Sequence, residues 1–248
     1  MNRYTSVLEK QLCLDYGCSP DDLRGGETQL RLFARRPGMR NVGRESALKI
    51  AVYRDQLLVM AAPELMDGCR ALFEGRRGTW LSEPKRLREI DDFLRQSGRR
   101  LADAHHHYLP CPIFPVLKSR FPLRWYERNE LEPFRGDPRF DEALLFDPET
   151  PDMLAVCAME GETILGMASV IRSCEKLWEI GVNVTEEGRG RGVGSCVVAA
   201  LKDEVLRRGV VPTYATVESH IRSQKVAFRA GFEPAFYEIF SETLSPEQ

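Results

Sequence analysis

The sequence predicts an α+β fold, and two features of its second half support this prediction. Short apolar runs typical of strands alternate with longer segments whose apolar residues recur at helical spacing. Two of these runs, residues 153–159 and 163–171, flank Glu160-Gly161-Glu162, a tight-turn signal that predicts a strand pair. The first half contains the same kinds of element less regularly, so an additional N-terminal α+β region is expected.

The elements of the first half are predicted from apolar spacing and from glycine and proline. Residues 7–16 are expected to form a helix, followed by a break at Gly25-Gly26, and residues 30–35 a strand. Residues 47–53 and 56–61 around Arg54-Asp55 indicate a hairpin. Pro63 suits a first helical turn and is expected to open a helix through residue 73, and residues 85–101 have helical spacing.

The second half continues with a strand, a helix, a strand, a helix and a strand. These are expected at residues 177–184, 195–208, 210–217, 221–230 and 235–240. Gly209 and Gly231 are predicted to end the two helices, and Ser219 to cap the second one at its N-terminus. Four prolines after His105-His106-His107 suggest a joint, so we predict an N-terminal region 1–124 and a domain 125–248.

Composition is that of a soluble globular protein with one large domain or two small ones. The chain has 248 residues, 43% of them hydrophobic and 29% charged. No apolar run approaches the roughly 20 residues that span a bilayer, and the first four residues lack a signal-peptide segment, so a cytoplasmic location is expected. The seven cysteines form no C-x-x-C pair and are expected to be reduced thiols.

The charge is unevenly distributed along the chain. A net charge of −2 gives no bulk attraction to nucleic acid. Residues 1–124 hold 22 Lys and Arg against 15 Asp and Glu, whereas the remainder holds 13 against 22. The acidic second half suggests a cationic substrate, and an attraction between the two halves is an equal alternative.

The loop at residues 189–194, with the sequence Arg-Gly-Arg-Gly-Val-Gly, lies between a predicted strand and a predicted helix. Glycines let backbone N–H groups approach a ligand, and a helix N-terminus favours anions. The loop therefore predicts binding of a phosphate group. Neither the dinucleotide pattern G-x-G-x-x-G nor the P-loop pattern with its lysine fits these residues.

The pattern that fits is R-x-x-G-x-G at Arg189, Gly192 and Gly194. Together with Ser223, Val226, Ala227, Gly231 and Phe232 downstream, it resembles the GNAT superfamily of N-acetyltransferases over residues 125–248. The resemblance implies a mixed, largely antiparallel sheet flanked by helices, and acetyl-CoA as cosubstrate. The cofactor-binding residues that it implies are Val182, Asn183, Val184, Arg189, Gly190, Arg191, Gly192, Val193, Gly194, Ser195, His220 and Ser223.

Glu179 is the predicted catalytic residue, because a carboxylate inside an otherwise apolar strand is unusual. It shares a strand face with Gly181 and Asn183, and Gly181 is expected to mark a bulge that opens the strand pair. In the family resembled, a glutamate here deprotonates the amine, and partial burial would raise its pKa as a general base requires. The alternative is a surface or ion-paired glutamate.

The chain departs from the family pattern in three places. The second motif begins with His220 in place of asparagine. Ala227 stands where a tyrosine usually protonates the leaving thiolate, which leaves Tyr214, Tyr237 or a water as the acid. Residues 125–150 are too few for the family's first strand and two helices.

The predicted function is acetyl transfer from acetyl-CoA to the primary amine of a small molecule. The alternatives are a protein lysine or N-terminal amine as acceptor, and a non-catalytic acyl-CoA-binding module. Neither nucleic acid nor a membrane is an expected partner, and the sequence allows a homodimer. No metal site is expected, since the adjacent histidines at 105–107 lack partners at ligand spacing.

Overall fold

The computed structural model describes residues 3–40, 46–114 and 117–244 and divides into two compact units. Unit 1 comprises Met1–Val7 and Tyr108–Pro234, and unit 2 comprises Leu8–His107 and Ala235–Gln248. The strands β4 (Arg99–Pro110) and β10 (Phe232–Thr243) contribute residues to both units. The domain boundary after residue 124 remains a prediction. Both units combine helices with mostly antiparallel strands, so the predicted α+β class is confirmed.

Among the described residues, five strands lie wholly in unit 1, in the order β9-β8-β7-β6-β5. The pairs from β5 to β8 are antiparallel, whereas β8 and β9 are parallel. Their bounds are β5 (Leu123–Glu127), β6 (Asp152–Glu160), β7 (Thr163–Ile171), β8 (Leu177–Val184) and β9 (Val211–Thr216). The helices are α5 (Val193–Arg207) and α6 (Ile221–Arg229), with short 3₁₀ helices η2 (Arg128–Glu130), η3 (Glu132–Phe134) and η4 (Glu186–Gly188).

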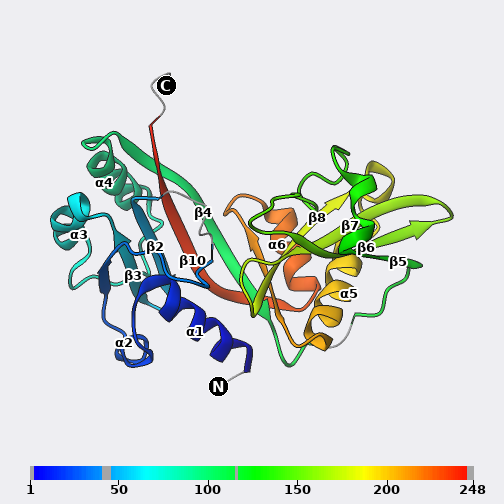
Figure 1. Cartoon of the computed structure of the whole chain (residues 1–248), viewed down its shortest axis with the longest axis horizontal. Helices are drawn as coiled ribbons and strands as arrows, with labels where there is room; N and C mark the ends of the chain where they lie inside the picture. The colour runs from blue at the N-terminus through cyan, green and yellow to red at the C-terminus, as the bar shows by residue number, and fades with distance from the viewer. Residues whose placement is uncertain (1–2, 41–45, 115–116, 245–248) are drawn as a thin grey trace. The chain divides into compact units, whose positions relative to one another are not determined.

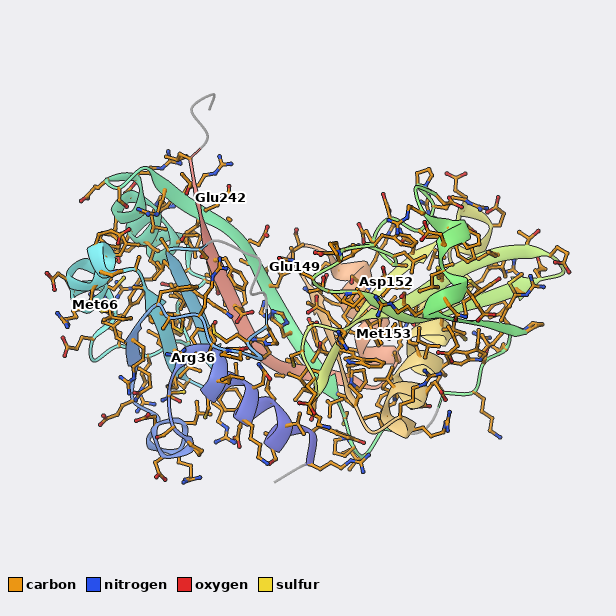
Figure 2. The ribbon with its side chains drawn as sticks, viewed as in Figure 1. Arg36, Met66, Glu149, Asp152, Met153 and Glu242 are labelled. Carbon is orange, nitrogen blue, oxygen red and sulfur yellow. The ribbon has the colours of Figure 1, made fainter. Side chains whose placement is uncertain are left out.

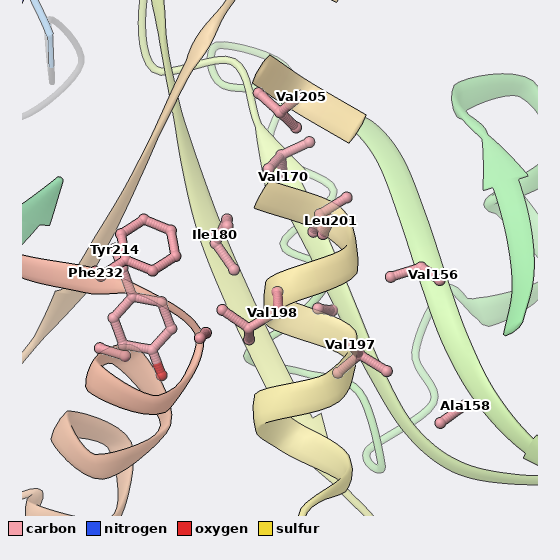
Figure 3. Packing of buried hydrophobic residues seen from close by; sticks show 14 of the residues in the cluster. Val156, Ala158, Val170, Ile180, Val197, Val198, Leu201, Val205, Tyr214 and Phe232 are labelled. Carbon is pink, nitrogen blue, oxygen red and sulfur yellow. The ribbon is translucent and has the colours of Figure 1, made fainter. Parts of the chain in front are cut away.

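Each face of this sheet is buried against a different cover. The helix α5 packs on β6, β7 and β8, with Val197, Val198 and Leu201 against Val170 and Ile180 in one core (Figures 1 and 3). The opposite face is covered by the irregular segment 131–144, which follows β5. The one helix in this segment is the short 3₁₀ helix η3, where the family resembled has two helices.

Unit 2 has the strand order β1-β3-β2-β10-β4. The strand β1 (Gln29–Leu32) runs parallel to β3 (Gln56–Ala61), and β2 (Leu48–Tyr53) is antiparallel to both β3 and β10. The helices α3 (Met66–Phe73) and α4 (Pro84–Arg95) share a core with β2 and β3. The remaining elements are α1 (Arg3–Tyr16), which begins in unit 1, α2 (Pro20–Gly25) and η1 (Pro63–Leu65).

A cluster of ionisable side chains is buried in unit 2 around Glu238, whose exposure is 0%. Its Oε1 accepts a hydrogen bond from the hydroxyl of Tyr16 at 2.6 Å, and it pairs with Arg40 at 3.1 Å and Lys49 at 3.5 Å. Burial alone would raise the pKa of Glu238, but these cations outweigh it and hold the pKa well below its usual range. Burial lowers the pKa of the neighbouring His107 to about 3.

Most predicted elements of the first half are confirmed, and the exceptions have local causes. The predicted helix 85–101 ends at Arg95, because Gly98 adopts a left-handed φ of 67° and the chain then enters β4. The capped helix α2 was not predicted, since six residues are too few to show a helical period. Ser219 does not cap α6, whose N-cap position is occupied by His220.

Candidate functional site

The loop 189–194 leads directly into the N-terminus of α5. Gly190 and Gly192 have φ values of 72° and 80°, a left-handed conformation that other residues rarely adopt. The first hydrogen bond of the helix runs from Cys196 N to the carbonyl of Gly192 at 3.1 Å. The amides of Val193, Gly194 and Ser195 precede it and so have no acceptor within the helix. This is the arrangement that binds anions at helix N-termini.

One side of the loop is closely packed against the protein, and the other side is open. A Cβ on Gly188 would lie 2.1 Å from the carbonyl oxygen of Leu165, so close packing fixes the loop on this side. A Cβ on Gly192 would have only the guanidinium of Arg120 within 4 Å, at 3.3 Å, and one on Gly190 would have no neighbour within that distance. The side that carries the two left-handed glycines is therefore open to a ligand.

Three arginines lie at or near this loop, and they differ in their partners. Arg191 pairs with Glu160 at 2.5 Å, and this hydrogen bond raises the pKa of the arginine. Arg189 is largely exposed and lies 3.7 Å from Glu186. Arg120, whose guanidinium approaches Gly192, comes from the proline-rich segment before β5 and was missed in the sequence analysis. No spacing pattern connects it to a loop 70 residues downstream.

The strand β8 separates from β9 partway along its length. Their parallel pairing extends from Leu177 opposite Val211 to Ile180 opposite Tyr214 in the described residues, although both strands continue beyond it. The rest of β8 therefore has an edge that β9 does not cover.

Alternation along β8 determines which backbone groups lie on that uncovered edge. The carbonyl of Lys176 accepts from Val211 N of β9 at 3.0 Å, whereas Thr185 N donates to the carbonyl of Leu165 in β7 at 3.1 Å. Because alternate residues of a strand direct their backbone groups to the same neighbour, even-numbered residues face β9. The backbone groups of Val182 and Val184 thus lie on the uncovered edge, where an extended ligand chain would find them.

Gly181 does not form the expected bulge, since the register between β7 and β8 is continuous from Gly166–Val184 to Ile171–Glu179. The position requires glycine for a different reason, a close backbone contact: a Cβ here would lie 2.1 Å from the carbonyl oxygen of Glu142. The opening of the sheet occurs on the other side of β8, toward β9, because the pairing ends there.

The segment around Glu142 is fixed to two strands. The Oδ1 of Asn183 accepts from the amides of Glu142 at 3.0 Å and Ala143 at 2.6 Å. The carboxylate of Asp152, labelled in Figure 2 at the start of β6, accepts from the amides of Leu145 at 3.3 Å and Phe146 at 2.8 Å. The side chain of Asn183 is thus engaged within the protein and holds this segment against β8.

Glu179 is half-buried in the paired part of β8, opposite Thr213 of β9 and Ile171 of β7. Alternation places it on the same face as Gly181 and Asn183, which is the face covered by the segment 141–144. It lies one residue before the point where β8 and β9 separate.

Tyr214, labelled in Figure 3, is the last residue of β9 that pairs with β8. Its hydroxyl lies 2.7 Å from the Oγ of Ser223 in α6. Burial raises the pKa of Tyr214 to about 12, so the hydroxyl keeps its proton at neutral pH. Ala227 is fully buried in the core beside it. Tyr237 belongs to unit 2, where its ring lies 4.8 Å from that of His106.

The structure brings most of the predicted site residues together in unit 1, around the loop, the end of β8 and the start of α6. His220 stands at the N-cap of α6 without a side-chain cap bond. The three adjacent histidines lie in β4, and His107 stacks on Phe236 with ring centroids 4.3 Å apart. In the described part of the chain, no helix is both long and apolar enough to cross a bilayer.

Comparison with known proteins gives a family match over the residues of this site. A GNAT acetyltransferase family model matches residues 153–240, which include β8, the loop, α5 and α6. A GCN5-related N-acetyltransferase-like protein from Streptococcus suis is 17% identical, with 96% of this chain and 99% of that chain covered and a TM-score of 0.51. No curated protein matches the sequence.

Two further solved structures are similar at lower TM-scores. An acetyltransferase of the GNAT family from Colwellia psychrerythraea is 14% identical, covers 96% of this chain and 95% of that chain, and has a TM-score of 0.47. A GCN5-related N-acetyltransferase from Kribbella flavida is 15% identical, with 62% and 63% covered and a TM-score of 0.46. The family model and the shared fold agree for residues 153–240, and this match supports an acetyl-CoA-dependent acyltransferase.

Proposed function

We propose that the enzyme transfers the acetyl group to the primary amine of a small cationic molecule by direct attack, with Glu179 as general base. The observation that carries the proposal is the separation of β8 from β9 immediately after Glu179 and Tyr214. The opening exposes strand backbone that can pair with an extended ligand, and it lies between a carboxylate and a protonated hydroxyl. Those two groups are what amine deprotonation and thiolate protonation require.

The cosubstrate is proposed to bind along the loop and the open edge of β8. The amides at the start of α5 and the guanidinium of Arg120 would hold the pyrophosphate, together with Arg189 and Arg191. The pantetheine arm would pair with the backbone of Val182 and Val184. Asn183 would not bond to the ligand directly, because its backbone groups face β7 and its side chain is bonded to the segment 141–143.

A cationic acceptor is supported by the charge of the segment that covers the Glu179 face. Asp141 and Glu142 lie in that segment, where Asp141 accepts from Asn183 Nδ2 at 3.1 Å. Glu142 is near enough to Tyr214 to contribute to its raised pKa. Two carboxylates beside the opening attract the ammonium group of a small acceptor. This contact does not require the shallow surface that a protein acceptor would need.

The reaction would proceed without a covalent enzyme intermediate. Glu179 takes a proton from the ammonium, and the free amine attacks the thioester carbonyl carbon. A backbone N–H on the open edge of β8, such as that of Val182, stabilises the oxyanion. The carbon–sulfur bond then breaks, and the thiolate takes its proton from Tyr214. The acylated nitrogen releases its second proton to solvent, which leaves the neutral amide, and Tyr214 recovers a proton from solvent through Ser223.

The test is steady-state acetylation of a panel of small amines and lysine peptides, with acetyl-CoA binding measured separately by calorimetry. Glu179→Gln is expected to lower kcat at least 100-fold near pH 7 and to leave acetyl-CoA affinity unchanged. Glu175→Gln, an exposed carboxylate before β8, is the matched control and is expected to retain activity. Full activity of Glu179→Gln would exclude the base, and turnover of peptides alone would exclude the small-molecule acceptor.

A further inference from the structure

A pocket of about 240 Å³ lies in unit 2, formed by β3, α3, α4 and the connection between the two helices. Its floor is apolar and buried, formed by Leu57, Phe73, Leu81 and Ile90 with exposures of 5% or less. A cavity of about 150 Å³ with such a lining accommodates benzene. The space in unit 2 is therefore sufficient for one aromatic ring with a short substituent.

The rim of this pocket has a different chemistry from its floor. Three arginines line it, Arg76, Arg77 and Arg86, against a single carboxylate, Glu89. Arg77 is paired with Asp55 at 2.7 Å and Arg86 with Glu89 at 2.5 Å. No carboxylate in the described segments of the chain pairs with Arg76, so the rim has an excess of positive charge.

Trp80 adds an aromatic surface to the same rim, although 67% of it is exposed. A large indole left in water gains little for folding, whereas it offers area and a π-face to a ligand. The neighbouring Leu81 is only 5% exposed, so it is Leu81 that anchors this segment to the core, and packing within the fold gives no reason for an exposed tryptophan.

The connection that carries Arg76, Arg77 and Trp80 is held in place by the β2–β3 turn. Asp55 accepts from the side chain of Arg77, from the amide of Thr79 at 3.2 Å and from its hydroxyl, and its carbonyl accepts from Gly78 N at 2.8 Å. The hydroxyl of Thr79 contributes most to lowering the pKa of Asp55, followed by Arg77. The pocket wall is thus formed before any ligand arrives.

We propose that this pocket binds a small organic anion with an aromatic body, such as an aryl-substituted carboxylate. The ring would enter the apolar floor beside Trp80, and the carboxylate would bond to Arg76 at the rim. The proposal concerns a binding site in unit 2 and does not depend on the acceptor or the mechanism of acetyl transfer.

The test is calorimetric titration of the full-length protein with 3-phenylpropanoate and with its neutral amide, in the absence of acetyl-CoA. The carboxylate is expected to bind about tenfold more tightly than the amide, since a hydrogen bond to a charged group is the stronger kind. Arg76→Gln is expected to abolish this preference, and Trp80→Ala to weaken both ligands. Arg95→Gln, an exposed arginine of α4 outside the pocket, is the matched control and is expected to change neither affinity.

Near-ultraviolet circular dichroism verifies that each variant is folded, and both Arg76 and Trp80 are exposed enough to be replaced without unfolding. Equal affinity for the carboxylate and the amide in the unmodified protein would overturn the proposal. So would an intact preference in Arg76→Gln, or the absence of binding by either ligand at millimolar concentration.

Discussion

Replacing Gly181 by alanine tests the packing that supports the acceptor side of the site. The added Cβ would lie 2.1 Å from the carbonyl oxygen of Glu142 and 3.1 Å from the Cα of Ala143, whereas ordinary contacts begin at 3.4 Å. Both neighbours are backbone atoms, so rotation of a side chain cannot relieve the clash. The segment 142–143 must move away from β8.

The cost can be worked out from what this movement breaks. Asn183 accepts two amide hydrogen bonds from the segment, at 3.0 and 2.6 Å, each worth about 1 kcal/mol. Overpacking of a rigid contact adds about 1–3 kcal/mol. We therefore expect Gly181→Ala to lower the free energy of unfolding by about 3–5 kcal/mol, and the melting temperature by roughly 10 °C.

The assay is thermal and urea unfolding of Gly181→Ala beside Gly190→Ala. Gly190 has a left-handed φ of 72° and no atom within 4 Å of an added Cβ, so its replacement costs backbone strain alone, about 1–2 kcal/mol. We also expect Gly181→Ala to reduce kcat for the amine, because the moved segment carries Glu142. Equal stability of the two variants would refute the reasoning, since it would mean that Gly181 is not held against the segment.

Three further outcomes are expected. Gly192→Asp should weaken acetyl-CoA binding at least tenfold in calorimetry by placing a carboxylate at the phosphate site, whereas Gly98→Asp, with a similar left-handed φ of 67° in unit 2, should not. Tyr214→Phe should lower kcat about tenfold or more with little change in acetyl-CoA affinity, and an unchanged kcat would remove Tyr214 as the acid. The free energy of unfolding should decrease as pH falls from about 6.5 toward 3. The pKa values of His107 and Glu238 are lowered in the folded state, so the unfolded chain binds more protons in this range. A free energy of unfolding that stays constant in urea titrations across this range would contradict the prediction.

Local signals in the sequence were sufficient for most of unit 1. The strand β8 was predicted with its observed bounds, because apolar alternation and β-branched residues coincide over 177–184. The glycine loop was predicted from its residue types, since left-handed φ values at Gly190 and Gly192 are a property of glycine itself. The GNAT assignment followed from two such local motifs in the right order.

Other features depended on contacts between distant residues, and no local pattern encodes these. The approach of Arg120 to Gly192, the pairing of Tyr214 with Ser223, and the contact between Gly181 and Glu142 each join segments that the sequence separates. The prediction of a bulge at Gly181 was wrong for the same reason. A glycine inside a strand indicates that another group approaches the backbone closely, but the sequence does not identify that group. The sequence by itself indicated the GNAT resemblance and acetyl-CoA as the cosubstrate, because both rest on a phosphate-binding loop of consecutive residues. Only the tertiary structure decided where β8 opens and which side chains surround the opening, because those depend on where strand pairing ends.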